Sequence, residues 1–371
     1  MKSQWPMVKL GDVLNYEQPT HYIVNTTQYD DTYPIPVLTA GQTFILGYTN
    51  ETENIYHKNL PVLIFDDFTT AIKYVDFPFK VKSSAMKILS NDKSKTSIKY
   101  LFYAMGRISI DTELHKRYWI SLYSNISIPL PPLSVQLQIV QKLDKVQLLI
   151  EQRKYQIEKL DLLAKSRFIE MFGDVSCNDK GWKIAKMSEI STSRLGKMLD
   201  AKKQTGQCSF PYLANINVRW FGFDFSSLRQ MDFNEADQQE FSLLKGDLLV
   251  CEGGEVGRCA VWDNEISPCF YQKALHRIRC DFKKILPEYL AWWFKCNCDK
   301  EAFENVAGAK ATIAHLPGVK LKNLNVATPP ISLQQDFVTF LRELDKSKFT
   351  IHKSLEKLKT LYRALLQEYF G

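Results

Sequence analysis

The sequence lacks any apolar run that could cross a membrane. The chain of 371 residues opens with Met1-Lys2-Ser3, and no apolar segment follows. It contains no uncharged apolar stretch of about 18 residues or more, which a membrane-spanning helix needs. We therefore expect neither a signal peptide nor a membrane partner, and we expect a cytoplasmic protein.

Cysteine is missing from the first half of the chain. All eight cysteines lie between Cys177 and Cys298. A disulfide framework would not normally be confined to one of two similar halves, so we expect reduced thiols. Cys296-x-Cys298 has no second cysteine pair at zinc spacing, even with His315 considered as a further ligand, so we expect no metal site.

Catalytic motifs are also scarce. Gly253-Gly254-Glu255-Val256-Gly257 lacks the Gly-Lys-Ser/Thr of a phosphate-binding loop, and a tight hairpin is the better interpretation. No nucleophile motif surrounds any serine. Apolar residues make up 45% and charged residues 24%, which is ordinary for a globular protein of two or three domains. The net charge of +7 is compatible with a polyanion partner but does not establish one.

What the sequence does contain is one segment that occurs twice. Residues 131–173 align without a gap to residues 329–371. The identical positions are Pro131-Pro132 and Pro329-Pro330, Ser134 and Ser332, Gln136 and Gln334, Val140 and Val338, Leu143 and Leu341, Glu158-Lys159-Leu160 and Glu356-Lys357-Leu358, Leu163 and Leu361, and Glu170-x-Phe172-Gly173 and Glu368-x-Phe370-Gly371. Such a match indicates an internal duplication.

Each copy predicts one long helix, because apolar residues recur at a spacing of three to four. Ser134 and Ser332 are expected as N-caps, and Gln335 would complete a capping box in the second copy. Gly173 and Gly371 fit the left-handed residue that follows a helix. Roughly 38 helical residues would span about 57 Å. Two apolar stripes of that length would most simply bury each other as an antiparallel coiled coil.

The segments before each helix form a second repeat of weaker identity. Residues 1–130 contain short β-prone runs and one helix candidate, and residues 174–328 follow the same plan without regular βα alternation. The expected fold class is therefore α+β. It has two mixed α/β domains, related by an approximate two-fold axis and separated by the helical spacers 131–173 and 329–371. Antiparallel pairing would bring the two termini together.

One loop differs between the two domains. The second domain has Gly254-x-x-Gly257-Arg258 where the first has Asp66 to Lys73 without glycine. We therefore do not expect the two loops to share a backbone conformation.

Two similar units held apart by a stiff spacer could read two separated patches on a DNA duplex. The scaffold would set the spacing between half-sites, as it does in dimeric readers. Because the two units differ in sequence, the two half-sites could differ as well.

The whole chain resembles the specificity (S) subunit of type I restriction–modification systems. The features that match are the Pro-Pro-Leu/Ile-Ser-x-Gln helix starts, the Glu-x-Phe-Gly helix ends, the Trp-x-x-x-x-Leu/Met-x-Asp/Glu opening of each unit, Gly246-Asp247-Leu248-Leu249-Val250, and Gly254-Glu255-Val256-Gly257-Arg258-Cys259-Ala260. The resemblance implies two target-recognition domains that read a bipartite double-stranded DNA site.

The resemblance also implies partner proteins and their cofactors. Two methyltransferase subunits carrying S-adenosylmethionine would dock on the paired helices, and translocating endonuclease subunits using ATP and Mg would join them. This chain itself would bind no cofactor and would not be an enzyme. Consistent with this, Leu130-Pro131-Pro132-Leu133 and Thr328-Pro329-Pro330-Ile331 lack both flanks of the Asp/Asn-Pro-Pro-Tyr/Phe tetrad of adenine methyltransferases.

Three alternatives remain open. The chain could be an enzyme in its own right, a coiled-coil adaptor that does not bind DNA, or the DNA-reading subunit of a methyltransferase without a nuclease. The sequence does not reveal the DNA target.

Residue type and expected loop position select the candidate DNA contacts. Lys and Arg suit phosphates, and Arg, Asn and Gln suit base edges. The candidates in the first domain are Gln42, Thr43, Thr69, Thr70, Lys73, Lys116, Arg117 and Tyr118, and those in the second are Lys197, Asn215, Asn217, Arg219, Arg258, Lys273, Lys310 and Thr312.

Overall fold

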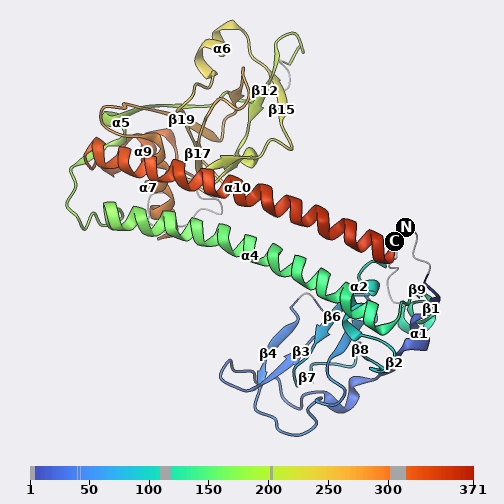
Figure 1. The fold of residues 1–371 in the computed structure, drawn as a ribbon. Helices are drawn as coiled ribbons and strands as arrows, with labels where there is room; N and C mark the ends of the chain where they lie inside the picture. Colours follow the sequence, from blue (N-terminus) through green and yellow to red (C-terminus); the bar gives the residue numbers. More distant parts are fainter. Residues whose placement is uncertain (1–4, 40, 42, 109–117, 201–203, 301–314) are drawn as a thin grey trace. The chain divides into compact units, whose positions relative to one another are not determined.

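A computed structural model describes residues 5–39, 41, 43–108, 118–200, 204–300 and 315–371. Its contacts divide the chain into two compact units, of which unit 1 is Met1–Tyr155 with Ile351–Gly371 and unit 2 is Gln156–Thr350. Each unit therefore contains one globular part together with the start of one long helix and the end of the other (Figure 1).

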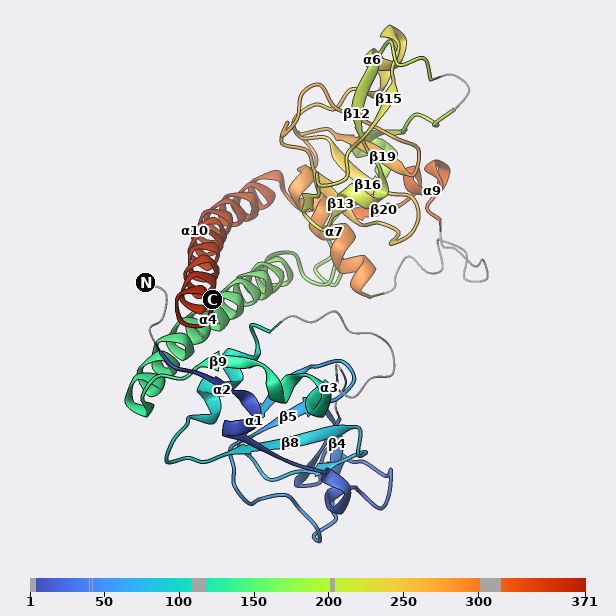
Figure 2. The same cartoon turned by 90° about the vertical axis from the view of Figure 1, so that its right-hand side faces the viewer.

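In the described residues, unit 1 contains three sheets. Their strand orders are β1-β9, β2-β8-β5-β6 and β4-β3-β7, and Figure 2 shows β5 beside β8. The strands are β1 Met7–Lys9, β2 Leu14–Glu17, β3 Ile35–Leu38, β4 Ile45–Thr49, β5 Val62–Asp66, β6 Ile72–Val75, β7 Lys80–Val81, β8 Met86–Asn91 and β9 Ser127–Pro129. The short helices are α1 Leu10–Val13, η1 Pro19–Tyr22, α2 Ile98–Met105, α3 Tyr118–Ser121 and η2 Tyr123–Asn125.

Unit 2 contains four sheets, with strand orders β10-β20, β11-β19-β16-β17, β15-β12-β18 and β13-β14. The strands are β10 Ile184–Lys186, β11 Ser191–Leu195, β12 Ser209–Leu213, β13 Val218–Arg219, β14 Gly222–Phe223, β15 Arg229–Asp232, β16 Leu248–Cys251, β17 Cys259–Val261, β18 Phe270–Tyr271, β19 Leu275–Cys280 and β20 Asn325–Ala327. The short helices are α5 Met187–Ile190, η4 Asn215–Asn217, α6 Glu235–Phe241, α7 Pro287–Asp299 and α9 Gly318–Lys322.

The two units share one topology, apart from the extra β13-β14 pair. In each, the first strand pairs antiparallel with the strand that leads into a long helix, β1 with β9 and β10 with β20. In each three-stranded sheet the central strand pairs parallel with one neighbour, β3 with β7 and β12 with β18. The duplication inferred from the helices therefore extends to the globular parts, as the sequence predicts.

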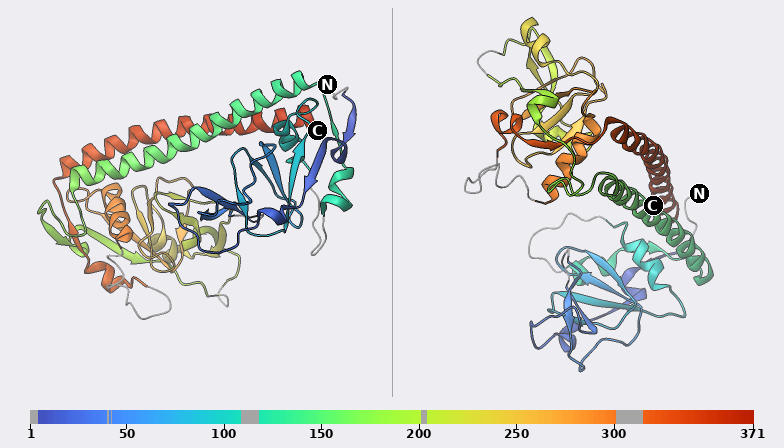
Figure 3. Two further views of the ribbon diagram at one scale, coloured as in Figure 1. Left: turned by 90° about the horizontal axis from the view of Figure 1, so that it is seen from below. Right: turned by 90° about the vertical axis from the view of Figure 1, so that its left-hand side faces the viewer.

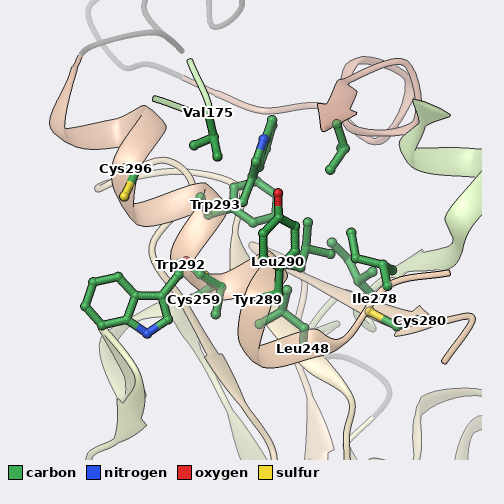
Figure 4. Close-up of a cluster of buried hydrophobic side chains, with 14 of the residues drawn as sticks. Val175, Leu248, Cys259, Ile278, Cys280, Tyr289, Leu290, Trp292, Trp293 and Cys296 are labelled. Carbon is green, nitrogen blue, oxygen red and sulfur yellow. The ribbon is translucent and has the colours of Figure 1, made fainter. Parts of the chain in front are cut away.

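Buried strands hold each four-stranded sheet together. Every residue of β5 and of β16 is buried, and each of these strands is bracketed by two antiparallel neighbours. Such continuous apolar runs are typical of strands covered on both faces. In unit 2 one of these faces packs on α7, where Tyr289, Leu290 and Trp293 lie against Leu248 and Ile278 in one buried cluster (Figure 4).

The long helices are α4 Leu133–Phe172 and α10 Ile331–Phe370, each of 40 residues. In unit 2 the end of α4 meets the start of α10, where Phe168 and Phe172 contact Phe337 at ring centroid distances of 5.3 and 5.4 Å. In unit 1 the start of α4 meets the end of α10, and Lys142 donates to the Tyr369 hydroxyl at 3.4 Å. The predicted antiparallel pairing of the helices is confirmed (Figure 3).

A buried glutamine anchors the start of each long helix. The Gln136 amide accepts from the Ser97 backbone at 2.9 Å and donates to the Pro131 carbonyl at 2.8 Å. Gln334 does the same with the Leu286 backbone at 2.8 Å and the Pro329 carbonyl at 2.8 Å. Both side chains are fully buried. Each glutamine thereby ties its long helix to the start of α2 or α7.

The predicted serine caps are wrong. The helices begin at Leu133 and Ile331, so Ser134 and Ser332 already lie in the first turn and the capping box with Gln335 does not form. The carbonyl before each helix, Pro132 or Pro330, accepts the first backbone bonds because the proline pair is itself fixed by the glutamine. At the other ends, Gly173 has the expected left-handed φ of 74°, whereas Gly371 does not.

The cysteines follow the expectation from their distribution, since all eight are free. Within the described ranges, no helix is both long and apolar enough to span a bilayer.

The glutamine anchors can be tested by stability measurements. Gln136→Ala and Gln334→Ala should each lower the free energy of unfolding by about 2–3 kcal/mol, because each leaves buried backbone groups without a partner. The exposed neighbour Gln138 supplies the control, and Gln138→Ala should change stability by less than about 0.5 kcal/mol. Equal effects of Gln136→Ala and Gln138→Ala in urea denaturation would contradict this role.

Candidate DNA interface

The hairpin between β5 and β6 carries three candidate DNA contacts, Thr69, Thr70 and Lys73. Its shape is set by Asp66, whose carboxylate accepts from the Phe68 backbone at 2.9 Å, the Thr69 backbone at 3.3 Å and the Thr69 hydroxyl at 2.6 Å. Thr70 has a φ of 61°, the left-handed region that residues other than glycine rarely adopt. In this hairpin the turn is formed by hydrogen bonds to the Asp66 side chain, whereas in unit 2 it is formed by glycines.

The candidates on this hairpin differ in exposure. Thr69 is exposed, whereas Thr70 and Lys73 are half-buried. The Lys73 ammonium lies 5.8 Å from the centroid of the Phe44 ring. That contact places the exposed Thr43, which precedes Phe44, beside the same hairpin. The structure therefore brings four candidates of unit 1 into one region.

A buried aspartate, Asp67, connects the hairpin to β8 and to the start of α3. The carboxylate of Asp67 lies 3.6 Å from the Lys87 ammonium, and these side chains are only 5% and 3% exposed. The same carboxylate accepts from the Trp119 backbone at 2.8 Å, and the Asp67 carbonyl accepts from the Tyr118 backbone at 3.1 Å. Asp67 thus joins the β5–β6 hairpin to the start of α3.

The prediction for Tyr118 is wrong. Its side chain is 4% exposed and belongs to the core of unit 1 with Trp119 and Tyr123, so it has no surface to offer DNA. The aromatic pattern that suggested a contact is a packing signal. The candidates Gln42, Lys116 and Arg117 lie outside the described residues.

In unit 2 the corresponding hairpin joins β16 to β17, as the glycine pattern predicts. Gly254 and Gly257 have φ values of 77° and 84°. The Arg258 guanidinium donates to the Asn215 carbonyl at 3.0 Å and pairs with Glu255 at 2.8 Å. The structure therefore brings two candidates, Asn215 and Arg258, together, and Arg258 holds the loop rather than extending from it.

Two further candidates of unit 2 have structural roles. Asn217 is 1% exposed, and its amide accepts from the Ala214 backbone and donates to the Asp224 carbonyl, both at 2.9 Å. The prediction that Asn217 contacts DNA is therefore wrong. The Lys197 ammonium is half-buried and donates to the Asp232 carbonyl and the Asp237 carboxylate, both at 2.6 Å.

The remaining described candidates of unit 2 lie on the surface. Arg219 is exposed and pairs with Asp224 at 3.0 Å. Lys273 is exposed, and its backbone donates to the Lys197 carbonyl at 2.8 Å. Lys310 and Thr312 lie outside the described residues.

Asp66, Asp67 and Phe68 are not among the candidates that the sequence predicts. Residue type selects side chains that could touch DNA, whereas Asp66 and Asp67 hold the loop in shape. The available signal was a pair of aspartates directly after an apolar strand, where a carboxylate commonly accepts backbone bonds of the following turn.

Cys251 and Cys298 of unit 2 do not resemble reactive or metal-binding thiols. Burial raises the pKa of Cys251 to about 11 and that of Cys298 to about 12, which leaves them protonated at neutral pH. In the part of the chain that the structure describes, no three His, Cys, Asp or Glu side chains are placed to hold a metal ion.

The sequence matches the family described as "Type I restriction modification DNA specificity domain" over residues 2–160 and 179–360. The specificity subunit of the type I restriction enzyme EcoR124I/EcoR124II from Escherichia coli is 53% identical over 147 residues, which is 37% of this chain and 36% of that protein. A putative type I specificity subunit from Haemophilus influenzae is 23% identical over 345 residues, 88% of this chain and 85% of that protein.

Solved structures show the same fold. The S subunit from M. genitalium superposes with a TM-score of 0.64 at 14% identity and covers 99% of this chain and 96% of that one. A chain from a study of complex assembly and conformational transition in the type I R-M system has a TM-score of 0.58 at 16% identity, covering 98% and 97%.

The family match covers most of the chain in two blocks, one for each unit. The chain therefore belongs to the specificity subunits of type I restriction–modification systems, which give DNA sequence specificity through two target-recognition domains and are not catalytic.

The buried ion pair under the unit 1 hairpin predicts a large effect on stability. Asp67→Ala should lower the free energy of unfolding by about 3–5 kcal/mol, because it leaves the Lys87 charge buried and unpaired. Glu343→Ala, which breaks the exposed pair with Lys346, should cost less than about 1 kcal/mol.

The double variant Asp67→Ala with Lys87→Met should recover part of the loss, since no buried charge remains. If urea denaturation showed that Asp67→Ala lowers the free energy of unfolding as little as Glu343→Ala does, the buried pair of Asp67 and Lys87 would not stabilise the fold.

Proposed function

We propose that this chain reads a bipartite, asymmetric site on double-stranded DNA. Residues 1–130 form the first target-recognition domain and residues 174–328 the second, and residues 131–173 and 329–371 are the spacers between them. The observation that carries the proposal is the duplicated topology, because one fold presents the corresponding hairpin, β5–β6 or β16–β17, in each domain.

Differences between the two hairpins support an asymmetric site. The loop of unit 1 is built by carboxylates and exposes Thr69, whereas the loop of unit 2 is built by glycines and an Arg258–Glu255 pair. Unlike side chains on the corresponding hairpins of one fold would read unlike bases. A symmetric protein dimer would instead read two identical half-sites.

Exposed apolar residues of α4 support docking of partner proteins. Leu148, Tyr155, Leu162 and Ile169 recur at heptad spacing and are 46–57% exposed. An apolar heptad stripe on an exposed helix favours a partner helix. We assign this stripe to methyltransferase subunits, two of which would carry S-adenosylmethionine and would in turn recruit endonuclease subunits that use ATP and Mg.

The DNA site can be mapped directly. The chain and its methyltransferase subunit should be expressed in a host that lacks other adenine methylation, and the methylated adenines located by long-read sequencing. We expect one motif of two unlike halves at a fixed separation. Exchanging residues 1–130 for those of another family member should change only one half of the motif. A site that changed in both halves would contradict the assignment, and absence of sequence-specific methylation would favour a DNA-independent adaptor.

The docking face gives a separate prediction. The double variant Leu148→Gln with Leu162→Gln should weaken binding of the methyltransferase subunit at least tenfold, because it removes apolar area from the stripe. The double variant Lys145→Gln with Lys154→Gln changes exposed residues of the same helix and should bind normally. Binding is measured by titration of the purified subunits, with melting temperatures to verify folding. Normal binding of the leucine variant would remove the stripe from the interface.

A further inference from the structure

Phe68 is an aromatic side chain at the tip of the β5–β6 hairpin, where a polar residue would be expected. It is 43% exposed. In the described part of unit 1 it belongs to neither buried cluster. By contrast Phe221, which is exposed to the same extent, stacks on Trp292 at 4.5 Å. The Phe68 ring is therefore not part of the described apolar core of unit 1.

The backbone beneath Phe68 is held unusually firmly. Phe68 directly follows two buried aspartates, Asp66 and Asp67, and its own amide donates to Asp66 at 2.9 Å. Asp67 is paired with Lys87 and accepts from the backbone of Trp119. Burial of a carboxylate is costly unless it finds partners, and here Asp66 is hydrogen-bonded while Asp67 is both hydrogen-bonded and paired. These bonds hold the backbone from which the exposed Phe68 side chain extends.

The β16–β17 hairpin of unit 2 has no counterpart to this ring. Its hairpin presents Gly254, Glu255 and Val256 between β16 and β17, and Glu255 accepts from the Trp220 indole at 2.6 Å. The exposed ring is therefore a property of the first recognition domain and is not required by the shared fold.

We infer that Phe68 inserts as an apolar wedge at a base step of the half-site read by unit 1. The inference rests on the proposed function and adds the chemistry of one contact to it. Apolar side chains on DNA-binding proteins enter between bases and partly unstack them. A rigid loop suits this task because a wedge must resist the restacking of the bases. The polar Thr69 beside it is placed to meet the exposed base edges or the backbone.

The wedge can be detected with 2-aminopurine, a base whose fluorescence rises when it is unstacked. The probe is a duplex carrying the mapped motif, with 2-aminopurine placed in turn through each half, bound to the chain together with its methyltransferase subunit. We expect a fluorescence rise at one non-methylated step of the unit 1 half. Phe68→Ala should abolish that rise and weaken binding about tenfold, the scale of losing one ring–base contact. Phe68→Leu should retain part of both effects.

The control is Phe282→Ala, which removes another exposed phenylalanine, 57% exposed, outside the hairpins. It should leave fluorescence and affinity unchanged. The inference is overturned if the Phe68→Ala complex keeps the fluorescence rise, or if the wild-type complex shows none while still methylating its motif. In those cases the proposed function stands. A wild-type complex that bound DNA with no sequence preference would overturn both the inference and the proposed function. Melting temperatures of all variants exclude unfolding as the cause.

Discussion

Each unit depends on the packing of one long helix's start against the other helix's end. In unit 2 the aromatic residues Phe168, Phe172 and Phe337 join the core that carries α7 and its sheet. In unit 1 Tyr369 and Phe370 complete a core that contains Leu143 and Tyr100. Neither globular part therefore has a complete core from a continuous stretch of chain. Folding of the recognition domains is coupled to pairing of the spacers, which suits a protein whose function is to hold two recognition surfaces.

The connection between spacer and recognition domain is polar and repeated. Gln136 and Gln334 each bridge a proline carbonyl and the start of a short helix. Tyr100 and Tyr289 each donate to the last carbonyl of the strand that leads into the long helix, β9 or β20, at 2.6 and 2.9 Å. Buried hydrogen bonds are directional, so they specify the angle at which a helix leaves its domain. The apolar core alone would supply stability without that precision.

Divergence between the two units is concentrated in the β5–β6 and β16–β17 hairpins. The corresponding loop is formed by different residues in the two units. Unit 1 uses Asp66 and Asp67, and unit 2 uses glycines together with Arg258. A shared fold with unlike loops is the expected outcome when duplicated domains come to read different sequences. Loops tolerate such change because they lie on the surface, outside the packed core.

The sequence by itself determined the duplication, the two long helices, their antiparallel pairing and the hairpin at Gly254, because periodicity and glycine placement are local signals. It misplaced the helix starts at Ser134 and Ser332, and it took the buried Tyr118 and Asn217 for surface contacts. Only the tertiary structure decided these points, since burial and long-range partners such as Gln136 with Ser97 depend on segments far apart in the chain. The support beneath Phe68 is of the same kind, because it comes from Lys87 and Trp119 in other elements of the fold.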